Sequence, residues 1–499
     1  MSALDRANAY TMRILSIIQP YMVEVAYFTF FLARHMSLPL FQEYVESEIY
    51  KQHHINGTPS QLEETFIESS DQYENAHRET TLTVLSLQIA EGLPAVISVL
   101  ILGAVSDRTG RRKILLWMPS LGSLVFSLVY IFIMYTGWTL DGLFMASAVR
   151  GLSGSMTAFL AGSTYFGVKA VDKSKISSRL ALQEFLNGAA YAIANLMVGY
   201  WVKDHGFLQP FWFMFILSAI ALLISVFLVV EVKVDNNITV NNNRYNSENC
   251  CIDTFRPMAR FFKCCSDRKL IKVWLAILAF QTYAIVHIGQ LNTLVLYLSG
   301  PPYAWPSTEI GLYLCVMMLV AAIGTFVVPP VLRRHFSDTT ITFAGFCSKA
   351  VGTLWIAVIK NETVLYFAIL LLVLELLPFP MLRSIVSKGI QTEDQGSLFA
   401  LMHCGESVTY FLAPLLFQAI YADTFRQFSG TVFVISCICL FAPVLLVVGI
   451  RYLEMNQPME YQPMEGESEM ATANDTTTTV TQQEEQQPIS VIQVNTERV

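Results

Sequence analysis

Long apolar runs, separated by short polar segments, make up most of this sequence. Each run is long enough to cross the hydrocarbon core of a bilayer, for which a helix needs about 20 residues. There are twelve such runs, near residues 16–40, 82–105, 114–136, 142–166, 180–202, 210–230, 271–298, 309–332, 338–359, 364–387, 397–421 and 430–450. The pattern predicts an all-α membrane protein with twelve transmembrane helices.

The runs form two sets of six on either side of a polar segment rich in Asn and Cys. The predicted parts are a cytoplasmic N-terminus at 1–15, a first six-helix bundle at 16–230 with an outer loop at 41–80, a cytoplasmic linker at 231–270, a second six-helix bundle at 271–451 and a disordered cytoplasmic tail at 452–499. Two bundles of this kind favour a substrate site near the middle of the membrane, between the halves.

Lysine and arginine are distributed unequally between the two sides of the membrane. With both termini in the cytoplasm, 23 of them fall on the cytoplasmic side and 6, including Arg34, on the outer side, which is the bias that orients membrane proteins. Of the 499 residues 54% are hydrophobic and 14% charged, against about 25% charged in soluble domains. The net charge of −7 does not indicate nucleic acid as a partner.

The loop between the second and third runs carries a dense motif, G-x-x-x-D-R-x-G-R-R-K at 103–113. Its glycines let helix ends approach closely, Asp107 can pair with an arginine, and its cations hold the loop in the cytoplasm. The motif resembles the loop 2–3 signature of the major facilitator superfamily, which implies gating by alternating access; a topology anchor is the alternative. The gating candidates are Gly103, Asp107, Arg108, Gly110, Arg111 and Arg112.

Ionisable side chains inside apolar runs cost about 2.5–3.5 kcal/mol each on insertion scales, so those that persist usually line a pathway or pair with one another. In the fifth run Glu184, Asn187, Tyr191 and Asn195 fall on one stripe of a helix. We interpret Glu184 as a proton-carrying carboxylate beside a water-accessible cavity. The alternative is a structural carboxylate satisfied by a neighbouring helix.

Two similar stripes lie in the second half. Tyr283, His287 and Gln290 share a face of the seventh run, and His403 and Glu406 share a face of the eleventh. Histidine titrates near physiological pH, so His287 is a candidate proton carrier. An interhelical hydrogen bond is an equally good interpretation of His287.

Arg150 in the fourth run and Arg383 in the tenth lie one in each half, so both could face an anionic substrate between the halves. Arginine suits carboxylates because it donates two parallel hydrogen bonds. The alternative is that they pair with internal carboxylates as gating salt bridges, and the sequence leaves both open. The predicted substrate-contacting residues are Arg150, Arg383, Asn187, Tyr191, Gln290 and Glu406. Lys349, Glu24 and Glu91 are weaker candidates.

Two stretches predict special backbone packing. Gly154, Ala158 and Gly162 follow Arg150 at four-residue spacing, which favours close contact between helices. Pro378 and Pro380 precede Arg383 in the tenth run and should loosen the helix there.

Modification and sorting signals lie outside the runs. Asn56 begins a glycosylation sequon in the first outer loop, with Pro59 directly after it. Tyr461 and Met464 fit a Y-x-x-Φ sorting signal in the tail. None of the nine cysteines lies in a segment predicted to be extracellular, so no extracellular disulfide is expected. Their spacing also lacks the form of a zinc site.

No signature for ATP binding or for a zinc hydrolase occurs. An enzyme is therefore not predicted and no cofactor is expected. We expect transport to be driven by a proton gradient. The expected partners are protons, the transported anion and membrane lipid, and the sequence is compatible with a homo-oligomer.

Four segments resemble one family, that of the proton-coupled folate transporter, the haem carrier and the thymic stromal cotransporter. They are 180–184, 286–289 with 294–298, 382–388 and 393–400. The resemblance implies that Glu184 and His287 couple transport to protons and that Arg383 and Arg150 are linked to substrate. The chain departs from the family in the first outer loop, which lacks the family's disulfide cysteine.

The leading hypothesis is therefore a proton-coupled symporter of an organic anion, folate-like or related, in the plasma membrane or in an endosomal or lysosomal membrane. Other anions carried in the family are haem, muropeptides, cyclic dinucleotides and steroid conjugates. The alternative from another class is a facilitator-fold receptor or scaffold that binds a ligand without moving it.

Overall fold

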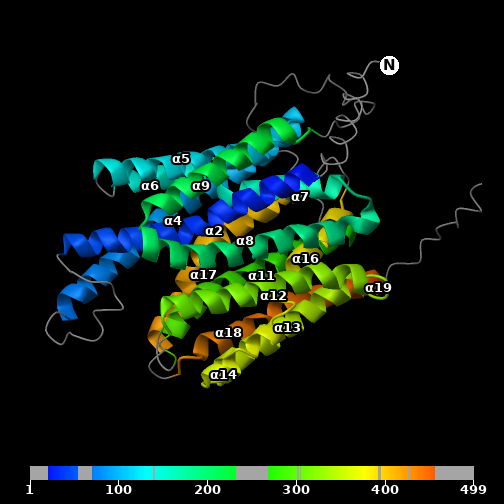
Figure 1. The fold of residues 1–499 in the computed structure, drawn as a ribbon. Coiled ribbons are helices and arrows are strands. Elements are labelled where there is room, and N and C mark those ends of the chain that lie inside the picture. Colours follow the sequence, from blue (N-terminus) through cyan, green and yellow to red (C-terminus); the bar gives the residue numbers. More distant parts are fainter. Residues whose placement is uncertain are drawn as a thin grey trace, which may run out of the picture. The chain divides into compact units, whose positions relative to one another are not determined.

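The computed structural model describes residues 21–53, 70–138, 141–231, 268–299, 303, 305–390, 395–424 and 428–455. All regular structure among these residues is helical (Figure 1), which confirms the all-α prediction. The first half contains α2 (Met22–Gln52), α4 (Ser70–Thr109), α5 (Ile114–Thr136), α6 (Asp141–Leu152), α7 (Ser155–Lys169), η2 (Lys173–Lys175), α8 (Ile176–His205), α9 (Leu208–Leu223) and the π-helical turn η3 (Ile224–Leu228).

The second half begins with a long helix that starts after the polar segment. It contains α11 (Arg268–Ser299), α12 (Ser307–Leu332), α13 (Asp338–Val358), α14 (Glu362–Leu365), α15 (Ala368–Leu371), α16 (Pro378–Lys388), α17 (Gln395–Thr424), α18 (Thr431–Cys439) and α19 (Phe441–Met455). The two halves meet mainly where α8 packs along α12 and where α4 packs along α17 (Figure 1).

Eight helical segments of the described chain are long and apolar enough to cross a membrane. They coincide with the second, third, fourth, sixth, seventh, eighth, ninth and twelfth predicted spans. The other four predicted spans are α2, α8, the interrupted segment from α14 to α16, and α17. Each of these four carries a buried ionisable side chain, namely Glu24, Glu184, Arg383 and Glu406. The described residues are thus consistent with twelve spans.

The predicted fourth span is two helices rather than one, because α6 ends at Leu152 and α7 begins at Ser155. Gly154 lies between them with φ +92°, a conformation that residues with a Cβ atom rarely adopt. A Cβ on Gly162 would lie 2.7 Å from the Cβ of Leu115 on α5. The predicted close packing is therefore confirmed at Gly162, whereas Gly154 turns the chain.

The predicted tenth span is also interrupted. Two single-turn helices, α14 and α15, are followed by turns and then by α16, which starts at Pro378. Proline suits the first position of a helix because its missing N–H would have no partner there. The interruption lies just before the two prolines, as expected, and α16 then carries Arg383.

Helices extend into the segment expected as the first outer loop. α2 continues to Gln52 and α4 starts at Ser70, so residues 41–52 and 70–80 are helical. The reason is visible in α2, where Phe41, Tyr44, Val45 and Ile49 form a buried apolar stripe at helical spacing. Tyr44 packs against Tyr130 of α5, and α2 packs along α9, which favours continuation of the helix.

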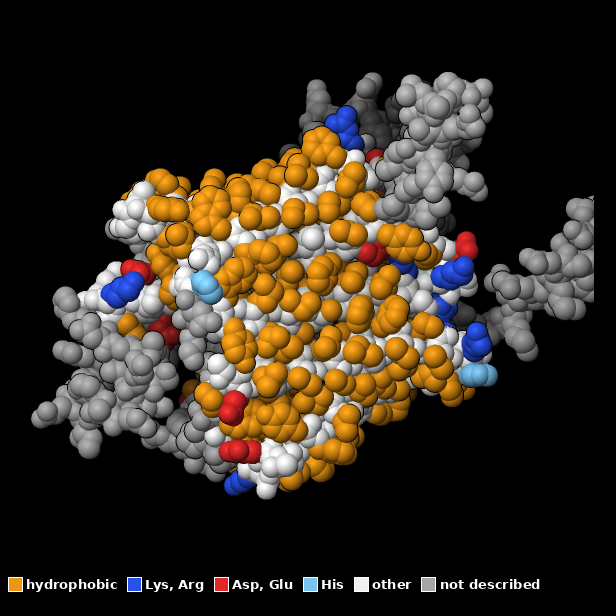
Figure 2. Space-filling model, viewed as in Figure 1, with side chains coloured by type: hydrophobic (Ala, Val, Ile, Leu, Met, Phe, Trp, Pro, Cys, Tyr) orange, Lys and Arg blue, Asp and Glu red, His pale blue; other side chains and the backbone are white. Residues whose placement is uncertain are grey.

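Apolar side chains cover the face of the molecule seen in Figure 2, with charged side chains mainly near its edges. Large exposed hydrophobic residues include Phe132, Ile220 and Leu354. A surface of this kind suits lipid rather than water.

Several predicted features lie outside the described residues. They are the N-terminal segment 1–15, the sequon at Asn56, the part of the linker at 232–267 with Cys250, Cys251, Cys264 and Cys265, and the sorting signal at Tyr461 and Met464.

Candidate substrate cavity

A cavity lies between the two halves and is lined by both of them. The first half contributes Arg34, Glu91 and Glu184 to the lining, and the second half contributes His287, Arg383 and Glu406. The predicted contact residues Asn187 and Tyr191 also line it, one and two turns along α8 from Glu184. Arg150 and Gln290 do not belong to the lining, although both are buried.

Glu184 and Arg383 form an ion pair across the halves. Nη1 of Arg383 lies 2.8 Å from Oε2 of Glu184, and both side chains are only 3% exposed. Nη2 of Arg383 lies 4.0 Å from Oε1 of Glu406, whose other oxygen is 2.6 Å from Nδ1 of His403. Of the two interpretations left open for Arg383, this arrangement corresponds to the salt bridge. We call Arg383, Glu184 and Glu406 the interhalf cluster.

The polar stripe of α8 connects this cluster to α2. The Nδ2 atom of Asn187 donates to Oε1 of Glu184 at 3.2 Å, and Oδ1 of Asn187 lies 2.9 Å from Nε2 of His35. The ring of His35 meets the ring of Tyr191 edge to face, with centroids 5.2 Å apart. Glu184, Asn187 and Tyr191 of the stripe predicted from sequence therefore line the cavity, whereas Asn195 is absent from the lining and donates to the carbonyl of Tyr191.

A second cluster lies in the first half and contains Arg34, Arg150 and Glu91. One guanidinium nitrogen of Arg34 is 3.2 Å from Oε1 of Glu91, and Arg150 pairs with Oε2 of the same carboxylate. Ser155 also donates to Glu91. Arg150 is held from behind by the ring of Phe126, 3.7 Å from its guanidinium carbon. We call Arg34, Arg150 and Glu91 the first-half cluster.

Sequence reasoning missed Arg34, which we counted on the outer side of the membrane. In the structure it lies in the middle of α2 and lines the cavity. The available signal was the position of Arg34 directly before His35 inside a run that could continue beyond residue 40.

The third cluster lies in the second half. Nζ of Lys349 on α13 is 2.6 Å from Oε2 of Glu375, and these side chains are 3% and 0% exposed. Nδ1 of His287 lies 3.8 Å from the same oxygen, and the hydroxyl of Tyr283 donates to the backbone carbonyl of Glu375. Nearby, Thr353 donates to Oε1 of Gln290 at 3.1 Å, so Gln290 has a structural partner rather than a place on the cavity wall.

The predicted gating loop is held together within the first half. Nη1 of Arg112 lies 2.9 Å from Oδ1 of Asp107, and the backbone N–H groups of Arg112 and Lys113 donate to the carboxylate of Glu231. Gly110 has φ +67°, which explains a glycine at this turn. Gly103 is buried, whereas the side chains of Arg108 and Arg111 are exposed.

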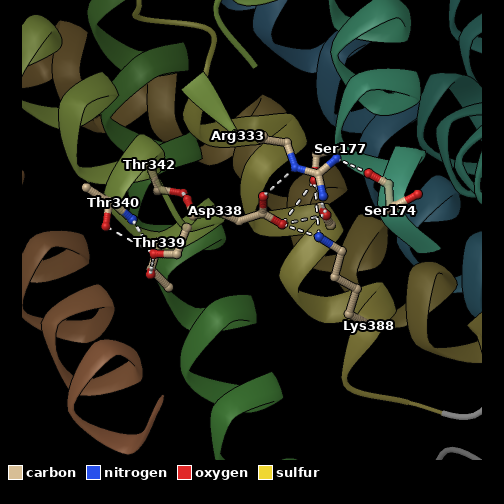
Figure 3. Close-up of polar contacts among 10 residues, drawn as sticks. Ser174, Ser177, Arg333, Asp338, Thr339, Thr340, Thr342 and Lys388 are labelled. Carbon is tan, nitrogen blue, oxygen red and sulfur yellow. Dashed lines mark hydrogen bonds and ion pairs between the residues drawn. The ribbon is translucent and has the colours of Figure 1, made fainter. Parts of the chain in front are cut away.

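A cluster around Asp338 joins the halves at the end predicted to be cytoplasmic (Figure 3). Asp338 pairs with Arg333, at 3.2 Å, and with Lys388. It also accepts from Ser177 of α8 at 3.0 Å, and Arg333 donates to the carbonyl of Ser174. Figure 3 shows Arg333 and Lys388 on the side of Asp338 that faces the first half. The halves are therefore bonded to each other at this end.

Within the part of the chain that the structure describes, no three His, Cys, Asp or Glu side chains are arranged to hold a metal ion. The ionisable residues of the cavity instead pair with one another.

A family model described as Major Facilitator Superfamily matches residues 24–414. Among curated proteins, the chain is 26% identical over 433 residues to the lysosomal proton-coupled steroid conjugate and bile acid symporter SLC46A3 of Gallus gallus, covering 84% of this chain and 91% of that protein. It is 25% identical over 365 residues to the proton-coupled folate transporter of Rattus norvegicus, covering 72% of this chain and 76% of that protein.

Solved structures share the fold at low sequence identity. The crystal structure of the human organic anion transporter MFSD10 superposes with a TM-score of 0.67 at 14% identity, covering 86% of this chain and 98% of that one. The fucose:proton symporter FucP of E. coli gives 0.58 at 15% identity, covering 87% and 98%.

Proposed function

The chain belongs to the Major Facilitator Superfamily, a family of multi-pass membrane transporters, and we propose that it is a proton-coupled symporter of an organic anion. The observation that carries this proposal is the buried ion pair between Glu184 and Arg383, in which each half of the transporter contributes one partner within a shared cavity.

The pair offers a direct way to couple a proton to an anion. While Glu184 is ionised, its carboxylate occupies Arg383. A proton on Glu184 removes one of the two negative charges that face Arg383, and the cavity then becomes more favourable for an anion. Proton and anion therefore favour each other's binding, and this coupling is reciprocal. Asn187, which donates to the other oxygen of Glu184, keeps the carboxylate in place.

The substrate class follows from the cavity wall. Beside the charged residues it carries Leu38, Met156, Leu160, Met318 and Phe379, so an anion with an extended apolar body fits best. The relatives named above are a symporter of steroid conjugates and bile acids and a transporter of folate, and these substrates are anions of that kind. We propose the plasma membrane or an endosomal or lysosomal membrane as the location, with the proton gradient as the driving force and no resident cofactor.

Uptake into proteoliposomes tests the proposal. Labelled oestrone sulfate, taurocholate and folate are offered at acidic and at neutral outer pH, with and without a protonophore. We expect accumulation of at least one anion that requires the inward proton gradient. Accumulation that does not depend on the proton gradient, or binding of the anions without any uptake, would refute symport.

The variant Glu184→Gln sharpens the test, because glutamine keeps the size of the side chain and one acceptor oxygen but cannot exchange a proton. Gradient-driven accumulation should be lost while exchange of preloaded substrate persists. The matched control is Glu309→Gln, since Glu309 is exposed at the start of α12 and should leave uptake unchanged.

A further inference from the structure

The three buried clusters around the cavity differ in charge balance. In the interhalf cluster one arginine faces two carboxylates, Glu184 and Glu406. In the second half, Lys349 and Glu375 balance each other. In the first-half cluster two arginines share the single carboxylate of Glu91, which leaves one positive charge in excess.

The two arginines of the first-half cluster occupy different positions. The side chain of Arg150 is 2% exposed, and it is fixed between Glu91, the ring of Phe126 and the hydroxyl of Ser37. The side chain of Arg34 is 16% exposed and lines the cavity. Its Nη1 donates to the hydroxyl of Ser37 at 3.0 Å, and its Nε, like that of Arg150, is buried without a hydrogen-bond partner among the described residues. The excess charge therefore reaches the cavity through Arg34.

We propose that Arg34 binds the anionic group of the substrate, a carboxylate or a sulfate, with Arg150 fixing the shared carboxylate of Glu91 behind it. This inference rests on the proposed function and adds a residue that determines specificity. Arg383 is occupied by Glu184 until a proton arrives, whereas Arg34 offers positive charge in both protonation states.

The surroundings of Arg34 suit one end of an amphipathic anion. Ser155 and Gln88 also line the cavity, and so do the apolar side chains of Leu38, one turn along α2 from Arg34, and Met156. A planar guanidinium can bind a carboxylate or sulfate through two parallel hydrogen bonds, and the low polarity around it strengthens the contact. An anion bound at Arg34 would neutralise the excess positive charge of the first-half cluster, and a proton on Glu184 or Glu406 would neutralise the excess negative charge of the interhalf cluster.

The test compares anion preference rather than uptake. Affinities of the purified transporter for oestrone sulfate, taurocholate and folate, and for uncharged oestrone, are measured at neutral pH without a gradient. In Arg34→Gln we expect the anions to bind about ten- to a hundredfold more weakly, with the affinity for oestrone unchanged. Arg34→Gln leaves Glu91 paired with Arg150 and Ser155, so the fold has no unpaired carboxylate.

Two further variants keep the inference open to refutation. Arg34→Lys retains the charge and should keep the preference for anions with only part of the affinity, because an ammonium cannot replace the planar fork. Arg334→Gln, at an exposed position between α12 and α13, is the control and should match the wild type.

The outcomes separate the two proposals. If the wild type prefers anions over oestrone and Arg34→Gln keeps that preference, Arg34 is not the anion site while symport stands. If Arg34→Lys matches the wild type for every anion, the two-bond contact is refuted. If the wild type binds no anion more tightly than oestrone, both proposals fail.

Discussion

Removing Lys349 should destabilise the second half strongly. Lys349 and Glu375 are 3% and 0% exposed, with 2.6 Å between Nζ and Oε2, and one oxygen of Glu375 is buried without a partner among the described residues. Loss of one partner from a buried pair costs about 3–5 kcal/mol, because the other charge stays buried and uncompensated. We expect a loss of that size in the free energy of unfolding of Lys349→Met.

The double variant Lys349→Met/Glu375→Leu provides the decisive comparison. It removes both charges and keeps apolar volume, so its stability should lie close to that of the wild type.

Unfolding of the detergent-purified protein in increasing dodecyl sulfate, followed by tryptophan fluorescence, measures these differences. Lys360→Met is the matched control, because Lys360 is exposed after α13. Equal stability of the wild type and Lys349→Met, or a double variant as unstable as the single one, would show that the pair does not hold the second half together.

Two other predictions concern closure and backbone geometry. Asp338→Asn weakens the ion pairs with Arg333 and Lys388, so hydrogen exchange should become faster in the first turn of α8 and around the start of α13. The control is Asp172→Asn, at an exposed position without a capping bond. Unchanged exchange in Asp338→Asn would show that the cluster around Asp338 does not hold the halves together. Gly154→Ala should destabilise the protein by about 1–2 kcal/mol from its positive φ alone, and more from the contact of the new Cβ with Ala158. Thermal unfolding compares it with Gly311→Ala, where the atom nearest to the new Cβ is 3.9 Å away. Equal stability of the two variants would contradict the prediction.

The helices could be predicted from sequence wherever apolar runs were long, but the interruption of the fourth span could not. The apolar run 142–166 predicts a membrane span, but hydropathy contains no information on the positive φ that Gly154 adopts. In the tenth span the prolines indicated where the helix would be loosened, and α16 starts at one of them. The length of α2 was underestimated because polar residues inside it look like a loop in a hydropathy pattern.

The cavity could be predicted in part. Glu184, Asn187 and Tyr191 were identified as one stripe because helical spacing is local, and all three line the cavity. The partner of each charge could not be read from sequence. Arg383 and Glu184 are 199 residues apart, and no local pattern distinguishes Glu184 from Glu375 or Glu91 as the carboxylate that Arg383 contacts.

The cross-half pairing of Arg383 also constrains how the polypeptide is made. During synthesis the fifth span is complete long before the tenth, so Glu184 already lies in the membrane when Arg383 emerges from the ribosome. An arginine within an inserting helix is disfavoured, by up to about 2.5–3.5 kcal/mol at the helix centre on translocon-based scales, and a helix as interrupted as the segment from α14 to α16 offers little apolar length to offset this cost. The tenth span therefore depends on a finished first half to receive it. A second half synthesised alone would lack the carboxylate of Glu184 for Arg383, which makes the first half an assembly template for the second.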